Sequence, residues 1–170
     1  MSVIIVSWNV WDLLRACLRS LEQVSRPAET ADRWRYFGPT ATQHRLEVIV
    51  VDSASSDVTA DLIPAQFPWV RLIRSDVNLG FTRGNNRGYA ASHGRFIFFL
   101  NPDTELINTP ACPDSLWELF TTLTTDETIG EQSGLEKINV TGDEIKKALL
   151  QGGSPATPDD LRKRFDRSPE

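Results

Sequence analysis

The sequence contains little cysteine and histidine, with two residues of each kind among its 170 residues. Cys17 and Cys112 lie far apart and show no metal-ligand spacing, which indicates ordinary thiols in a reducing compartment. His44 and His93 are isolated, so we expect them in loops or at the surface, without a metal role. This scarcity excludes a disulfide-stabilised framework and a metal centre built from cysteine and histidine.

Long apolar runs are also missing. The longest, such as Val48–Val51, fall far short of the roughly 20 residues that a membrane-spanning helix needs. The first nine residues contain neither a basic leader nor a cleavage site, so no secretory signal is predicted. These two absences together predict a cytoplasmic protein.

Lysine is absent from the first 108 residues, where 11 acidic residues balance 11 arginines. Residues 109–170 contain 12 acidic and 7 basic residues, including every lysine of the chain. This shift in composition predicts a domain over residues 1–108 followed by an acidic tail over 109–170. The lack of a basic excess argues against a nucleic-acid partner.

Apolar segments alternate with helical patterns along the first part of the chain. Buried strands are predicted at residues 2–7, 46–51, 70–74 and 96–100, and helices at residues 13–21, 58–66 and 82–92. Such alternation predicts an α/β fold with a parallel sheet and right-handed crossovers. The third helix is rich in glycine and alanine, which suits close approach to another backbone or to a ligand. Residues 25–45 have no clean period, and we expect a long loop there.

Polar residues follow three of the predicted strands. Ser7 and Asn9 follow the first, Asp52 the second, and Asp103 the fourth, where Pro102 ends the strand because it has no backbone N–H. The crossovers bring these positions to one carboxyl edge, where ligands bind in open α/β sheets. The alternative interpretation is a set of ordinary polar turns, with Asp52 as a turn residue before a helix.

Three stretches resemble a known family: VIIVSWNVWDLLRACLRSL, EVIVVDSASSD and VRLIRSDVNLGFTRGNNRGYAASHGRFIFFLNPDTEL. Over residues 1–108 they are similar to the nucleotide-binding half of a family 2 glycosyltransferase. The likeness is strongest to the rhamnosyltransferase-like branch, whose Asp-x-Asp motif often appears as Asn-Pro-Asp-Thr. The resemblance implies a GT-A fold, a Rossmann-like, mostly parallel sheet with flanking helices.

The resemblance also implies site residues. Those expected to bind the nucleotide-sugar are Val6, Ser7, Asn9, Asp52, Arg83 and Asn86. The first three would border base and ribose, and Asp52 would accept a hydrogen bond from the base. Asp103 would hold Mg²⁺ or Mn²⁺ on the diphosphate, since hard cations take oxygen ligands and neutralise a developing negative charge. Arg83 as a pyrophosphate ligand and Asn86 beside the sugar compete with solvated surface positions.

The chain departs from this family after Asn108, where an acceptor-binding half with a catalytic base is not recognisable. A short helix is predicted at residues 113–123, and two more helix starts at 141–144 and 157–160. The pattern therefore predicts a small helical unit in the tail. Its spacing supports no substitute base among Asp126, Glu127, Glu131 and Glu136.

The expected function is transfer of a sugar from a UDP- or dTDP-sugar to a glycan or lipid-linked acceptor in cell-envelope polysaccharide synthesis. A divalent cation is the expected cofactor, and peripheral association with the inner membrane face is the expected location. Two alternatives stay open. One is a non-catalytic nucleotide-binding or protein-interaction module, and the other is a fragment with an exposed sheet edge.

Overall fold

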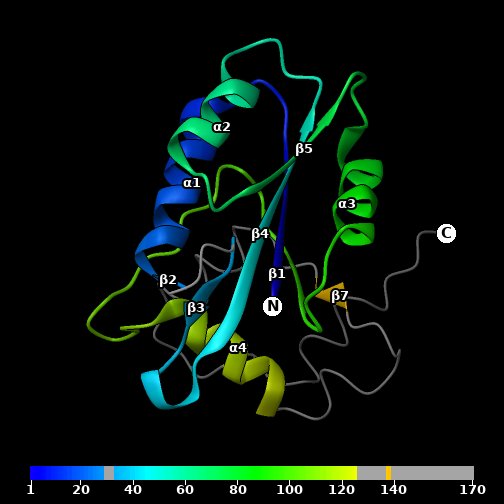
Figure 1. Cartoon of the computed structure of the whole chain (residues 1–170). Coiled ribbons are helices and arrows are strands. Elements are labelled where there is room, and N and C mark those ends of the chain that lie inside the picture. The colour runs from blue at the N-terminus through cyan, green and yellow to red at the C-terminus, as the bar shows by residue number, and fades with distance from the viewer. Residues whose placement is uncertain (29–32, 126–136, 139–170) are drawn as a thin grey trace, which may run out of the picture.

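The computed structural model describes residues 1–28, 33–125 and 137–138, and its centre is a mostly parallel sheet (Figure 1). β1 (Ser2–Ser7) lies between β4 (His44–Ser53) and β6 (Ile97–Phe99), and both pair with it in parallel. β5 (Arg71–Ser75) pairs in parallel with β4. The predicted α/β architecture is therefore confirmed. Its β-branched runs form strands because such side chains pack well on a pleated, buried surface.

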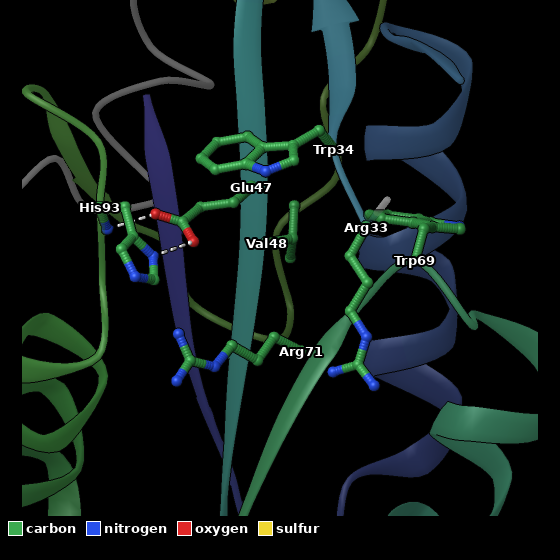
Figure 2. A pocket seen from close by; sticks show the side chains of 7 residues that line it. All are labelled: Arg33, Trp34, Glu47, Val48, Trp69, Arg71 and His93. Atoms are coloured by element: carbon green, nitrogen blue, oxygen red, sulfur yellow. Dashed lines mark hydrogen bonds and ion pairs between the residues drawn. The ribbon is translucent and has the colours of Figure 1, made fainter. Parts of the chain in front are cut away.

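Helix α3 (Gly80–Ala90) covers one face of the sheet (Figure 1). A Cβ atom on Gly84 would lie 2.7 Å from Val6 Cγ1, and one on Gly88 would collide with Ile4 Cγ2. The expectation that these glycines permit close approach is therefore confirmed. The end of the helix is held as well, because Arg71 Nη1 donates to Ala91 O at 2.6 Å. Glu47 also accepts from the backbone N–H of His93, and this pair appears in Figure 2.

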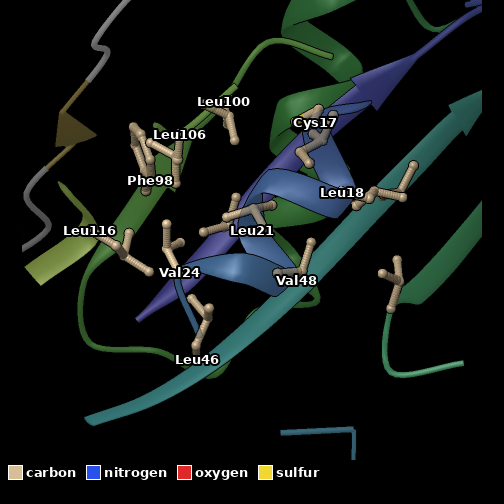
Figure 3. Close-up of a cluster of buried hydrophobic side chains, with 14 of the residues drawn as sticks. Cys17, Leu18, Leu21, Val24, Leu46, Val48, Phe98, Leu100, Leu106 and Leu116 are labelled. Atoms are coloured by element: carbon tan, nitrogen blue, oxygen red, sulfur yellow. The ribbon is translucent and has the colours of Figure 1, made fainter. Parts of the chain in front are cut away.

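Helix α1 (Trp11–Gln23) covers the opposite face, where the main hydrophobic core lies (Figure 3). Alternate strand residues point to this side. The core is formed largely by Val3, Ile5, Val48 and Val50 of the strands with Leu14, Cys17, Leu18 and Leu21 of the helix. Helix α2 (Thr59–Gln66) adds the buried Ile63 and contains Pro64. Full burial of each large aliphatic side chain stabilises the fold by about 1.5–3 kcal/mol.

The prediction of a structureless loop over residues 25–45 is wrong, because this range contains two strands, a 3₁₀ turn and the start of β4. β2 (Arg26–Pro27) and β3 (Arg35–Phe37) form an antiparallel pair, and β3 extends the sheet by pairing with the first residues of β4. A short 3₁₀ turn, η1 (Thr40–Thr42), leads into β4. The hydrophobic pattern did not predict β3, because its first residue, Arg35, is charged and yet buried. The Arg35 guanidinium donates to the carbonyl oxygens of Glu22 and Ser25.

The described part of the tail packs on the domain. Helix α4 (Ser115–Thr125) confirms the predicted short helix, and Asp114 caps it by accepting from the N–H of Trp117 at 3.0 Å. Leu116 and Phe120 are buried in the same core as α1, and the Phe120 ring meets Phe37 edge-on at 5.3 Å. β7 (Lys137–Ile138) pairs in parallel with β6. The two later predicted helix starts lie outside the described residues, as do Asp126, Glu127, Glu131 and Glu136.

Candidate functional site

Two buried side chains at the carboxyl edge of the sheet each have an oxygen atom without a hydrogen-bond partner among the described residues. Ser7 ends β1 and lies in direct register with Asp52, one residue before the end of β4, and the two are 0% and 3% exposed. Within the described part of the chain, Ser7 Oγ and one carboxylate oxygen of Asp52, Oδ1, have no hydrogen-bond partner. Buried polar atoms are nearly always satisfied, because a missing partner costs about 1–3 kcal/mol. This pair is therefore suited to receive donor and acceptor groups of a ligand.

The exits of β1 and β4 are tied together by Asn9. This residue has a left-handed φ of 54°, which asparagine tolerates better than most residues, and its side-chain oxygen accepts from the N–H of Ser56 at 2.7 Å. Its own N–H donates to Ser55 Oγ at 3.0 Å, and the Ser55 N–H donates to Asp52 Oδ2 at 3.2 Å. One network therefore orients the Asp52 carboxylate. The helix begins after Val10, so Asn9 joins two loops and does not cap α1.

Asp57 supports the same junction. Its carboxylate accepts from the N–H of Thr59 at 3.0 Å and from the N–H of Trp11, the first residue of α1, at 3.4 Å. Desolvation opposes the charge, but hydrogen bonds from Thr59 and Trp11 hold the pKa of Asp57 below its usual value. A carboxylate at the start of a helix also interacts favourably with the helix dipole.

The start of α3 is fixed to the end of β4 by a second set of contacts. Ser53 Oγ accepts from the N–H of Leu79 at 2.6 Å and donates to Asn78 Oδ1 at 3.2 Å. Asn78 Oδ1 also accepts from the N–H of Gly80 at 2.8 Å. Sequence reasoning missed Ser53 and Asn78, since the two bonds of Ser53 span 26 and 25 residues.

The remaining nucleotide candidates lie on or against α3. The Val6 side chain faces Gly84. Arg83 and Asn86 are exposed, and Arg83 Nε donates to the carbonyl of Leu79 at 3.2 Å. Asn85, in contrast, is buried at 8% exposure. The structure thus joins Ser7, Asn9 and Asp52 in one cluster. No hydrogen bond or ion pair among the described residues joins Arg83 or Asn86 to this cluster.

Asp103 lies in an exposed turn after β6. The turn is closed by a bond from the Thr104 N–H to Asn101 O at 3.2 Å, and the Cys17 thiol lies 3.8 Å from the same carbonyl. Burial, and then the charges of Asp103 and Glu105, raise the pKa of Cys17 to about 12, so this thiol stays neutral. No group of three or more acidic, histidine or cysteine side chains that suits a metal occurs in the described ranges. A lone exposed carboxylate fits a Mg²⁺ or Mn²⁺ ion that takes its other ligands from phosphate and water.

Several apolar side chains at this edge are unusually exposed. Trp8, directly after β1, is 55% exposed, and Phe81, in the first turn of α3, is 56% exposed. Val58 and Val77, near the exits of β4 and β5, are exposed as well. Sequence reasoning did not select them, because apolar residues beside strands predict core positions.

None of the described helices has the length and apolar character to cross a bilayer.

Three comparisons relate the chain to known proteins. The sequence model of the family described as Glycosyl transferase family 2 matches residues 2–160, well beyond Asn108. The uncharacterized glycosyltransferase YibD of Escherichia coli K12 is 28% identical over 112 residues, which are 64% of this chain and 27% of YibD. The chain thus spans about a quarter of the length of this curated relative.

Solved structures share the fold. Residues 1–349 of Staphylococcus aureus TarS in complex with UDP-GlcNAc match with a TM-score of 0.52 and 20% identity, over 73% of this chain and 31% of that one. Mannosyltransferase PcManGT of Pyrobaculum calidifontis, in complex with GDP-Man and Mn²⁺, matches with a TM-score of 0.54 and 21% identity, over 76% and 33%. These similarities place the described sheet and helices in the GT-A fold.

Proposed function

Because the chain belongs to glycosyltransferase family 2, we propose that it binds a nucleotide-diphosphate sugar at the carboxyl edge of its sheet and takes part in transferring that sugar. The observation that carries the proposal is the register pair of Ser7 and Asp52, which is buried and holds two oxygens without partners among the described residues. Hydrogen bonds formed at such a low-dielectric position are stronger than those formed in water.

The pair suits a pyrimidine base. Uracil and thymine both present an N3–H donor, and Asp52 Oδ1 is an acceptor fixed by the Ser55 and Asn9 network. Ser7 Oγ can donate to, or accept from, an adjacent base or ribose group. Val6 and Asn9 would border the base and ribose. UDP- and dTDP-sugars are therefore the donors that we propose.

The diphosphate would lie toward the helix and the turn after β6. Asp103 would hold a divalent cation together with phosphate oxygens and water, and this cation would neutralise the charge that develops on the leaving diphosphate. Arg83 and Asn86 are exposed on α3, where a guanidinium and an amide can reach an anionic donor without breaking a core contact.

The acceptor that we propose is a glycan or lipid-linked sugar of cell-envelope polysaccharide synthesis, met at the cytoplasmic side of the inner membrane. A non-catalytic nucleotide-binding module is the second candidate. It is favoured by the sequence after Asn108, in which no acceptor-binding half with a catalytic base is recognisable.

The test is calorimetric titration of UDP, dTDP and GDP into the purified chain with Mn²⁺ and with EDTA. We expect UDP and dTDP to bind more tightly than GDP, and only with metal. Asp103→Asn should abolish binding even with Mn²⁺, whereas Glu105→Gln, which changes an exposed carboxylate two residues away, should not. A folded wild-type chain that binds no nucleotide would refute the site. Release of free sugar from a donor that binds would separate an enzyme from a module.

A further inference from the structure

On one edge of β4, two residues are not paired with a neighbouring strand among the described residues. β3 pairs with residues 44–46 of this strand and β5 with residues 49–53, while β1 occupies the opposite edge along residues 47–52. Glu47 and Val48 therefore lie between the end of one neighbouring strand and the start of the other. A pocket of about 400 Å³ opens there, lined by Arg33, Trp34, Glu47, Val48, Trp69, Arg71 and His93 (Figure 2). Its volume lies in the range of small-molecule sites.

Two indole rings give this pocket flat apolar faces. Trp34 directly precedes β3, and Trp69 lies just before β5. Both side chains therefore line the pocket together with Val48. The Trp69 ring is held edge-on against Phe67 at 6.1 Å and beneath the guanidinium of Arg35 at 4.8 Å. Figure 2 shows Trp34 on one side of Val48 and the two lining arginines on the other. The Trp69 face is therefore positioned by contacts within the protein.

The polar groups of the pocket are mainly donors. Its one carboxylate, Glu47, already accepts from Ser2 Oγ and from the N–H groups of His93 and Gly94, and its second oxygen lies 3.3 Å from His93 Nδ1. Arg71 uses one nitrogen on Ala91 O. The Trp69 indole N–H is buried and has no partner within the described part of the chain. With the exposed Arg33 included, the pocket offers cations and N–H groups but few unused acceptors.

We infer that this pocket binds an acidic saccharide, a sugar ring that carries a carboxylate or phosphate group. The C–H face of the ring would pack on the indoles, and the anion would meet Arg33 and Arg71, whose planar guanidinium groups suit carboxylate and phosphate. The choice of a sugar over other flat anions rests on the proposed glycosyltransferase function. The pocket holds a part of a glycan that does not react, because Ser7 lies five strand steps, about 17 Å, farther along the sheet.

The test is a titration of the ¹⁵N-labelled full chain, followed by NMR, with tetragalacturonate as the probe. Trp34→Phe and Trp69→Phe assign the two indole N–H resonances, and both should shift on addition of the probe. Maltotetraose, a neutral saccharide, and benzoate, a flat anion without a sugar, should leave them unchanged. Arg33→Gln should weaken binding about tenfold, since it removes a charge-assisted contact. Arg19→Gln, an exposed arginine on α1, is the matched control and should bind like the wild type.

Four outcomes overturn the inference. They are the absence of indole shifts with tetragalacturonate, equal binding of maltotetraose, equal binding of benzoate, and an unchanged affinity in folded Arg33→Gln. The amide spectrum shows directly that each variant is folded. Titration of UDP and Mn²⁺ into the same samples separates the two proposals. If tetragalacturonate binds and UDP does not, the saccharide pocket is supported and the proposed donor site is refuted. If UDP binds and tetragalacturonate does not, the donor site is supported and the saccharide pocket is refuted.

Discussion

The contact between Gly88 and Ile4 predicts a substitution whose effect changes sign with its neighbour. A Cβ at position 88 would overlap Ile4 Cγ2, and Val51 Cγ2 is only 3.3 Å away, so the helix cannot accept a methyl group without moving. Overpacking of this kind costs about 1–3 kcal/mol. The higher helix propensity of alanine returns about 1 kcal/mol. Gly88→Ala should therefore destabilise the wild-type chain by up to about 2 kcal/mol.

In the Ile4→Ala background the same change should stabilise the chain. Truncation of Ile4 to alanine removes Cγ1, Cγ2 and Cδ1 and costs about 2–5 kcal/mol because it leaves a cavity, but the new methyl group at position 88 then fills part of it. The propensity gain of about 1 kcal/mol should reappear. Urea denaturation of the wild type, both single variants and the double variant gives the coupling free energy. A Gly88→Ala variant more stable than the wild type would refute the close approach of α3 to β1.

Three further predictions concern the core, the edge and pH. Leu116→Ala should lower the free energy of unfolding by about 2–5 kcal/mol, while the exposed Glu118→Ala should have little effect; equal midpoints in urea would show that α4 is not part of the core. Asn9→Ala should destabilise the chain more than Asn9→Gly by about 1–2 kcal/mol in thermal unfolding, because both lose the bond to Ser56 but only alanine is strained at a φ of 54°. Desolvation raises the pKa of Glu47, but bonds from Ser2 and His93 bring it below its usual value. Because its pKa is depressed by folding, Glu47 should contribute stability above the unfolded value of about 4.3 and lose it as the pH falls through the folded value; a Glu47→Gln variant with the same melting-temperature profile between pH 3 and 6 would contradict this.

The parts of the fold that follow from local patterns were predictable from the sequence. The β-branched run before Ser7 and the apolar run before Asp52 are continuously apolar, as buried strands are, so Ser7 and Asp52 were expected at one carboxyl edge. Their direct register is a finding of the structure. The glycines of α3 indicated close packing, and Gly84 and Gly88 indeed face β1.

The remaining features depend on contacts that the sequence does not show. β3 was missed because burial of Arg35 is made possible by acceptors 10 and 13 residues away. The role of Asn9 depends on backbone groups about 47 residues later, so its turn character was visible but its bond to Ser56 was not. Which of two adjacent asparagines on α3 is buried depends on helix rotation over the sheet, and the structure buries Asn85 while Asn86 is exposed.

The most direct test of the donor site is the affinity of UDP, in the presence of Mn²⁺, for the wild type, for Asp52→Asn and for Asp76→Asn. Asp76 is an exposed carboxylate and serves as the control. Hydrogen bonds to charged groups contribute about 1.5–3 kcal/mol, so Asp52→Asn should weaken binding at least about tenfold while Asp76→Asn leaves it unchanged. Equal affinity of all three folded proteins would contradict the assignment of Asp52, and with it the buried pair at the centre of the proposed site.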